Sequence, residues 1–136
     1  MRILVIDAQG GGIGGQLVSA VKAACPEDEV IAIGTNSTAT ARMLKAGADV
    51  AATGENPVVV NARRADVIMG PIGIVIADAM YGEITPKMAM AVGQSDAVRI
   101  LIPVNHCSNI VAGVQENLKG LIAGAVDSLR ELAGKH

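Results

Sequence analysis

The chain has 136 residues, of which 51% are hydrophobic and 18% are charged, and its formal net charge is -2. The negative net charge argues against a basic surface for nucleic acid. The chain contains no Phe, no Trp and a single Tyr, so it also lacks the aromatic side chains on which proteins stack bases, and we expect no nucleic-acid partner. The length fits one domain over residues 1–136, and the low share of charge predicts an apolar patch and hence a homo-oligomer, most simply a homodimer.

No segment predicts a leader or a membrane span. Asp7 interrupts the first apolar run, and the longest apolar stretch, residues 67–77, contains two glycines and a proline and falls short of the ~18–20 residues that span a bilayer. The two cysteines, Cys25 and Cys107, form no CxxC pair, and the scattered His and Cys residues lack the spacing of metal ligands. We therefore expect a cytoplasmic protein with free thiols, no metal site and no membrane partner.

Strand-like and helix-like segments alternate along the chain. The predicted strands are residues 3–7, 30–33, 49–52, 67–69 and 99–104, and residues 110–114 are a candidate sixth strand. The predicted helices are residues 14–24, 37–46, 74–80, 86–92 and 115–133; residues 54–57 predict a loop, and residues 58–63 fit either a helix or a strand. This alternation is typical of a parallel sheet with helices on both faces. The sequence therefore predicts a single compact, doubly wound, Rossmann-like α/β domain.

The last predicted helix is amphipathic. Its apolar residues recur at the spacing of a helix that covers a sheet. They are Leu118, Leu121, Ile122, Ala125, Val126, Leu129 and Leu132. Gly120 and Gly124 on the same helix permit a close contact with a neighbouring strand or with a second subunit.

A glycine-rich turn follows the first predicted strand and precedes the first predicted helix. It consists of Gly10, Gly11, Gly12, Ile13, Gly14 and Gly15. Gly10, Gly12 and Gly15 fit a GxGxxG pattern, whose glycines allow a tight turn, the approach of a pyrophosphate and close helix packing, respectively. The helix N-terminus attracts an anion. The turn thus predicts a phosphate-bearing small molecule as ligand; the alternative is a turn that only lets helix and strand pack closely.

The loop after the second predicted strand bears on the choice of ligand. NAD sites place an Asp or Glu about 20 residues beyond the glycines, but this loop holds Thr35, Asn36 and Ser37, with Arg42 further along the helix. These donors suit a 2′-phosphate, so the sequence predicts NADP as the cofactor. The alternative is that Asn36 or Ser37 caps the helix and Arg42 is simply solvated.

Two further loops lie at predicted strand ends. The second glycine turn, Gly70, Pro71, Ile72 and Gly73, either admits a ring or ribose or only leads into the next helix. In the polar loop 103–109, Asn105 or Ser108 is a candidate ligand contact, whereas His106 and Cys107 are adjacent in sequence and therefore make a poor base and nucleophile.

No catalytic group emerges from the remaining loops. Glu55 or Asn56 is a candidate polar contact in an otherwise plain turn. Lys87 follows Tyr81 by six residues instead of four, which excludes the Tyr–Lys pair of short-chain dehydrogenases, and Thr85 is more simply the N-cap of the helix that follows it. Enzymatic activity stays open, and the competing hypothesis is a non-catalytic regulatory module that senses a nucleotide or metabolite and acts through a partner protein.

Two resemblances arise at these residues. Gly12-Ile13-Gly14 resembles the close of the short-chain dehydrogenase glycine motif, although Ala8 stands in place of its first glycine. More extensively, the chain resembles an uncharacterised bacterial family, domain of unknown function 3842, in the segments 7–14, 34–36, 44–49, 52–56, 70–74, 82–88 and 102–103. That resemblance implies a small Rossmann-like protein with no assigned activity. His106 departs from the basic or polar residue expected there, which weakens a catalytic role for it.

Overall fold

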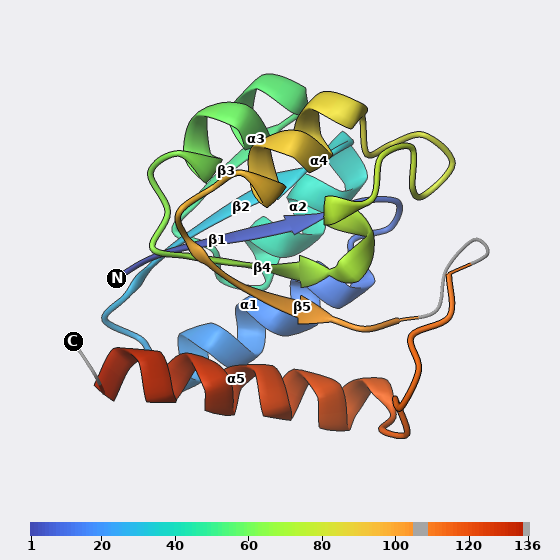
Figure 1. The fold of residues 1–136 in the computed structure, drawn as a ribbon. Helices are drawn as coiled ribbons and strands as arrows, with labels where there is room; N and C mark the ends of the chain where they lie inside the picture. The colour runs from blue at the N-terminus through green and yellow to red at the C-terminus, as the bar shows by residue number, and fades with distance from the viewer. Residues whose placement is uncertain (105–108, 135–136) are drawn as a thin grey trace.

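The structure is a computed structural model that describes residues 1–104 and 109–134. Helices and strands alternate almost throughout (Figure 1). In chain order the elements are β1 (Arg2–Asp7), α1 (Gly12–Ala24), β2 (Glu29–Gly34), α2 (Ser37–Lys45), β3 (Val50–Thr53), α3 (Glu55–Ala62), β4 (Val67–Pro71), the short 3-10 helix η1 (Ile72–Val75), α4 (Pro86–Gly93), β5 (Val98–Ile102) and α5 (Leu118–Gly134).

The five strands form one parallel sheet in the order β3-β2-β1-β4-β5. From β1 the chain steps outward through β2 to β3, then crosses back over the sheet to β4 and continues to β5. The strand order therefore reverses between β1 and β4. This arrangement confirms the predicted doubly wound, Rossmann-like α/β fold.

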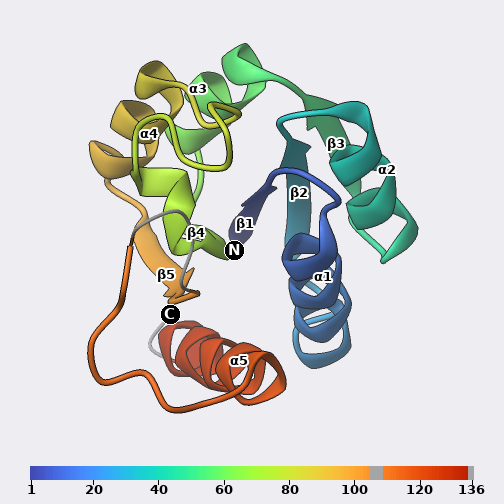
Figure 2. The same ribbon diagram turned by 90° about the vertical axis from the view of Figure 1, so that its right-hand side faces the viewer.

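Two aliphatic cores fill the two faces of the sheet. One lies beneath α1, α2 and α5, and the other lies beneath α3, α4 and η1 (Figures 1 and 2). Successive residues of β1 contribute to opposite cores: Ile3 and Val5 to the first, Leu4 and Ile6 to the second. A strand buried on both faces reads as a continuous apolar run, which is why β1 could be predicted.

The amphipathic face predicted for the last helix is confirmed. Ile122, Ala125, Val126 and Leu129 of α5 are buried in the first core, and Leu118, Leu121 and Leu132 pack against its margin. The apolar side of α5 therefore covers its own sheet, and Gly124 lies exposed on the helix.

Three predictions about local structure are wrong or incomplete. Residues 74–80 are not a helix: η1 ends at Val75, and backbone φ is positive at Asp78, Met80 and Tyr81, which no α-helix allows. The apolar side chains of this segment are buried in the second core, and their spacing along the sequence resembles that of a buried helix. Residues 55–57 are not a loop, because α3 begins at Glu55, and Pro57 fits its first turn, where no backbone N–H is needed.

The candidate sixth strand at residues 110–114 is also absent. These residues are irregular, and Gly113 has a φ of 85°. They lead from β5 to α5 outside the sheet (Figure 2). The ambiguous segment 58–63 is helical through Ala62.

Candidate functional site

A pocket of about 160 Å³ opens at the carboxyl ends of β1 and β4, where the strand order reverses. Its walls are the end of β1 with the turn that follows it, the last residue of β4, and one residue of the loop beyond η1: Asp7, Ala8, Gln9, Gly10, Gly11, Gly12, Ile13, Pro71 and Met80. Open α/β sheets bind ligands at this point. Whole drug-sized ligands occupy about 300–1,000 Å³, so this pocket suits a phosphate-sized group, and a larger ligand would extend beyond it.

A larger hollow of about 360 Å³ lies between α3 and α4. It is lined by residues of the two helices and of the turns that follow them, among them Val59, Arg63, Lys87 and Met90, and no strand residue lines it. We favour the smaller pocket as the functional site, because only that one combines strand ends with a helix N-terminus.

Two glycines of the first turn are required by the fold. Gly11 has a φ of 71° and precedes α1 as its N-cap, and a Cβ there would lie 2.8 Å from the Ala39 backbone. At Gly14, a Cβ would lie 2.7 Å from the Cβ of Asp7 and 2.6 Å from Met43 Sδ. The turn-forming and helix-packing roles expected of Gly10 and Gly15 are therefore met by Gly11 and Gly14.

Gly10 and Gly12, by contrast, have room for a side chain. No atom of the described residues lies within 4 Å of a Cβ at Gly10, and the nearest of them to a Cβ at Gly12 is Arg42 Nη1, at 3.9 Å. Neither residue has a positive φ. Neither packing nor backbone conformation explains glycine at these two positions, whereas the close approach of a ligand to the backbone would.

The first turn of α1 keeps unused donors. The Gly14 N–H donates to Asp7 Oδ2 (2.6 Å), and the Gly15 N–H donates to the Gly11 carbonyl (2.8 Å). Within the described residues the N–H groups of Gly12 and Ile13 have no hydrogen-bond partner. Asp7 is 4% exposed and also accepts a bond from Ala8 N–H (2.8 Å), so it caps α1 in place of the side chain that Gly11 lacks.

Arg42 of α2 lies along this turn. Its Cγ is 3.4 Å from the position of a Cβ at Gly15, and its guanidinium reaches the neighbourhood of Gly12. The Arg42 guanidinium forms no hydrogen bond or ion pair with any residue in 1–104 or 109–134. A guanidinium that has no partner among the described residues therefore lies beside the N-terminus of α1.

The loop after β2 is held by a residue that the sequence did not suggest. Glu83 Oε1 accepts hydrogen bonds from Thr35 Oγ1 (2.6 Å), Asn36 Nδ2 (2.8 Å) and Gln9 N–H (2.9 Å). Asn36 Oδ1 in turn accepts from Ala39 N–H (2.9 Å), so Asn36 is the N-cap of α2, as one interpretation predicted. The third predicted donor, Ser37, is exposed.

The hydrogen bonds keep Glu83 ionised. Burial disfavours its charged form, but the donors on Thr35, Gln9 and Asn36 together outweigh burial and lower its pKa below the ordinary value of 4.5. Glu83 is therefore a fixed negative charge at the carboxyl ends of β1 and β2. Because it follows β4 and not β2, no spacing rule for the glycine motif identifies it.

The second glycine turn serves packing. A Cβ at Gly70 would collide with the carbonyl oxygen of Ile6, and one at Gly73 would lie 2.8 Å from Met80 Cε. Pro71 is the one residue of this turn in the pocket wall, and Ile72 begins η1 beside it. Asn105, together with His106, Cys107 and Ser108, lies outside the described residues.

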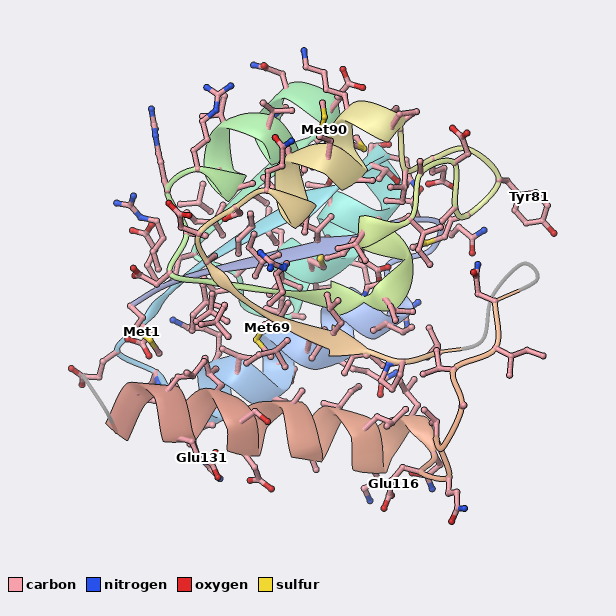
Figure 3. All side chains as sticks on the ribbon, viewed as in Figure 1. Met1, Met69, Tyr81, Met90, Glu116 and Glu131 are labelled. Atoms are coloured by element: carbon pink, nitrogen blue, oxygen red, sulfur yellow. The ribbon has the colours of Figure 1, made fainter. Side chains whose placement is uncertain are left out.

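The remaining polar candidates have structural partners. Thr85 Oγ1 donates to Glu55 Oε2 (2.5 Å) and accepts from Met88 N–H (3.1 Å), which confirms Thr85 as the N-cap of α4 and ties Glu55 to that helix. Tyr81 is 90% exposed at the tip of its loop (Figure 3).

In the described part of the chain, no group of three His, Cys, Asp or Glu residues is placed to hold a metal. No helix there is long and apolar enough to cross a membrane.

Sequence comparison assigns the family. The profile of the domain of unknown function DUF3842 matches residues 2–134. The chain belongs to this family. A search of curated protein sequences finds no significant match.

Among solved structures, the chain is similar to a dodecameric FMN-dependent Ubix-like decarboxylase from Escherichia coli O157:H7. The identity is 14%, the TM-score is 0.49, and the match covers 98% of this chain and 94% of that one. At so distant a likeness, the cofactor and assembly of that enzyme remain properties of that enzyme.

Proposed function

We propose that this DUF3842 protein binds a phosphate-bearing small molecule, with a phosphate group at the N-terminus of α1. The observation that carries the proposal is the set of donors left unused there: the N–H groups of Gly12 and Ile13 and the guanidinium of Arg42 have no partner in the described residues. A phosphate accepts several such bonds at once, and the helix dipole adds to the attraction. The open space at Gly10 and Gly12 leaves the backbone accessible to it.

NADP is the cofactor that the sequence predicts, and two contacts bear on it. Arg42 lies at the turn, as a phosphate contact requires. Thr35 and Asn36, however, already donate to Glu83. The NADP prediction depends on the lack of a carboxylate at the end of β2, and Glu83 brings one there. NADPH and NADH are therefore the matched probes that test the NADP prediction.

The test is Gly12→Val. A branched side chain at position 12 would occupy the space between the α1 N-terminus and Arg42 Nη1, which the described residues leave open. We expect normal thermal unfolding and a loss of at least about tenfold in affinity, because hydrogen bonds to a charged group contribute about 1.5–3 kcal/mol each. The measurement is calorimetric titration with inorganic pyrophosphate, NADH and NADPH, preceded by mass spectrometry of small molecules released from the purified protein.

Gly93→Val is the matched control. Gly93 is exposed and is the last residue of α4, and a Cβ there would meet no atom of the described residues within 4 Å. It should bind all probes as the wild type does. If Gly12→Val folds and binds every probe as tightly as the wild type, the phosphate site is elsewhere.

The competing function is a non-catalytic module that senses a nucleotide or metabolite for a partner protein. Both functions predict the same binding site, and turnover separates them. Oxidation of bound NADPH or NADH by added hydride acceptors, at a rate above that of free cofactor, would favour an enzyme. Tight binding without turnover, accompanied by ligand-dependent capture of a partner, would favour the sensor.

We also propose that the protein acts in the cytoplasm as a homodimer. The apolar face of α5 is covered by its own sheet, so a second subunit would have to use other surfaces. Leu44, Val50, Met90 and Val98 are large apolar side chains that remain about half exposed on four different elements. Light scattering at tens of micromolar checks this proposal, and a strictly monomeric mass at that concentration contradicts it.

A further inference from the structure

Glu83 stands next to the phosphate pocket without belonging to its wall. Its carboxylate is bound to the N–H of Gln9, which immediately precedes the first glycine of the turn. Met80, three residues earlier in the same loop, lines the pocket. A ligand that placed a phosphate at Gly12 and extended over the end of β2 would therefore meet Glu83 next.

One carboxylate oxygen is fixed and the other is available. Oε1 accepts all three hydrogen bonds, from Gln9, Thr35 and Asn36. Oε2 accepts none from the residues that the structure describes. Because Asn36 also donates to the Gln9 carbonyl (2.9 Å) and caps α2, the whole donor set is rigid. Oε2 is thus a preorganised acceptor on a partly exposed side chain.

The charge of this acceptor restricts what it can recognise. A carboxylate accepts hydrogen bonds strongly from hydroxyl groups and repels a phosphate placed at the same point. Dinucleotide folds use a carboxylate at the end of the second strand to bind a ribose 2′-hydroxyl. Here Thr35 and Asn36 occupy that strand end, and they hold in place a carboxylate supplied by the loop after β4.

We propose that Glu83 is the specificity-determining residue of the site: Oε2 accepts a hydrogen bond from a free ribose hydroxyl, and the ligand is a nucleotide without a 2′-phosphate. This inference rests on the proposed function. It assigns Arg42 to the phosphate at the glycine turn instead of to a 2′-phosphate, in keeping with its place beside Gly12 and Gly15.

The experiment compares NADH and NADPH, which differ only in the 2′-phosphate, by calorimetry on wild type and Glu83→Gln. Inorganic pyrophosphate probes the phosphate site alone. We expect wild type to bind NADH about tenfold or more tightly than NADPH. In Glu83→Gln the amide oxygen can still accept from Thr35 and Asn36, so the loop should stay in place while the charge is lost. The ratio between the two affinities should fall to about threefold or less, with pyrophosphate affinity unchanged.

Glu131→Gln is the matched control, since Glu131 is an exposed carboxylate on α5, far along the chain from both turns (Figure 3). It should keep the wild-type ratio. Equal affinities, tighter NADPH, or a ratio unchanged by Glu83→Gln overturns the inference while leaving the proposed function standing. Pyrophosphate binding with neither dinucleotide bound does the same. Failure of all three probes to bind overturns the proposed function itself, and this inference with it.

Discussion

The two glycine turns, after β1 and after β4, look alike in sequence but use their glycines differently. In the turn at the end of β4, both glycines are buried against protein: Gly70 against the Ile6 carbonyl and Gly73 against Met80. After β1, Gly11 and Gly14 are packed in the same way. Only the first turn has glycines with open space beside them, Gly10 and Gly12.

This difference separates a structural turn from a binding turn. A glycine whose absent Cβ would strike backbone is explained by the fold, and it carries no information about a ligand. A glycine that the fold does not need calls for another explanation, and at an N-terminus with unused N–H groups the approach of an anion is the natural one. The number of glycines in a motif is therefore a weaker indication of binding than the surroundings of each one.

The largest effect is expected at Gly70. In Gly70→Ala the new Cβ would press on the Ile6 carbonyl within the sheet, where the backbone cannot move without disturbing β1. We expect a loss of about 3 kcal/mol or more in the free energy of unfolding, at the upper end for overpacking. Urea unfolding followed by far-ultraviolet circular dichroism measures it, since the chain has no Trp.

Gly93→Ala serves as the control for that substitution, because a Cβ there meets nothing within 4 Å. It should leave stability unchanged or slightly raised. A loss below about 1 kcal/mol in the free energy of unfolding of Gly70→Ala, well under what overpacking against backbone should cost, would show that the backbone at Gly70 can move to make room for a methyl group. The distinction between the two turns would then fail.

Much of the fold could be predicted because its signals are local. β1 and β2 are continuous apolar runs, α5 has a regular apolar stripe, and Asn36 and Thr85 are N-caps at the starts of their helices. Residues 74–80 misled for a physical reason: their apolar side chains are buried by the second core while the backbone turns through positive φ values, and burial pattern alone does not record backbone direction.

At the site, the turn and the nearby Arg42 follow from position in a βαβ unit, but Glu83 does not. Its bonds to Thr35 and Asn36 join residues 48 and 47 positions apart, across the point where the strand order reverses. Such a contact is set by how the loop after β4 folds back over β1 and β2. The sequence shows only the absence of an acid after β2, and absence there led toward NADP.

Glu83 joins the turn after β1 to the loop after β2, and the stabilisation from these bonds should depend on pH. Its pKa is lowered in the folded protein from 4.5, so its ionised form stabilises the fold at neutral pH, and that contribution is lost as the pH falls below about 4.5 toward the lowered pKa. We expect the melting temperature of the wild type to fall more steeply over this range than that of Glu83→Gln. Asp49, whose pKa is also lowered, is present in both proteins, so the difference isolates Glu83. Parallel curves would mean that the carboxylate does not hold the turn after β1 and the loop after β2 together.

The smallest effect on stability is expected at Gly10, and it tests the comparison most directly. Gly10 is exposed, its φ is not positive, and a Cβ there meets none of the described residues within 4 Å. Gly10→Ala should therefore change the free energy of unfolding by no more than about 0.5 kcal/mol. The change is a slight gain if the main effect is that alanine lowers the conformational entropy of the unfolded chain. Pyrophosphate affinity, measured on the same sample, should nevertheless fall, because Gly10 lines the pocket and the methyl group would take up part of its space. A destabilisation above about 1 kcal/mol would assign this glycine to the fold, like Gly70, since exposed sites without special constraints vary by only about 0.5 kcal/mol. Unchanged stability with unchanged affinity would leave Gly10 with no role in either, and the phosphate contact would then have to lie nearer to Arg42.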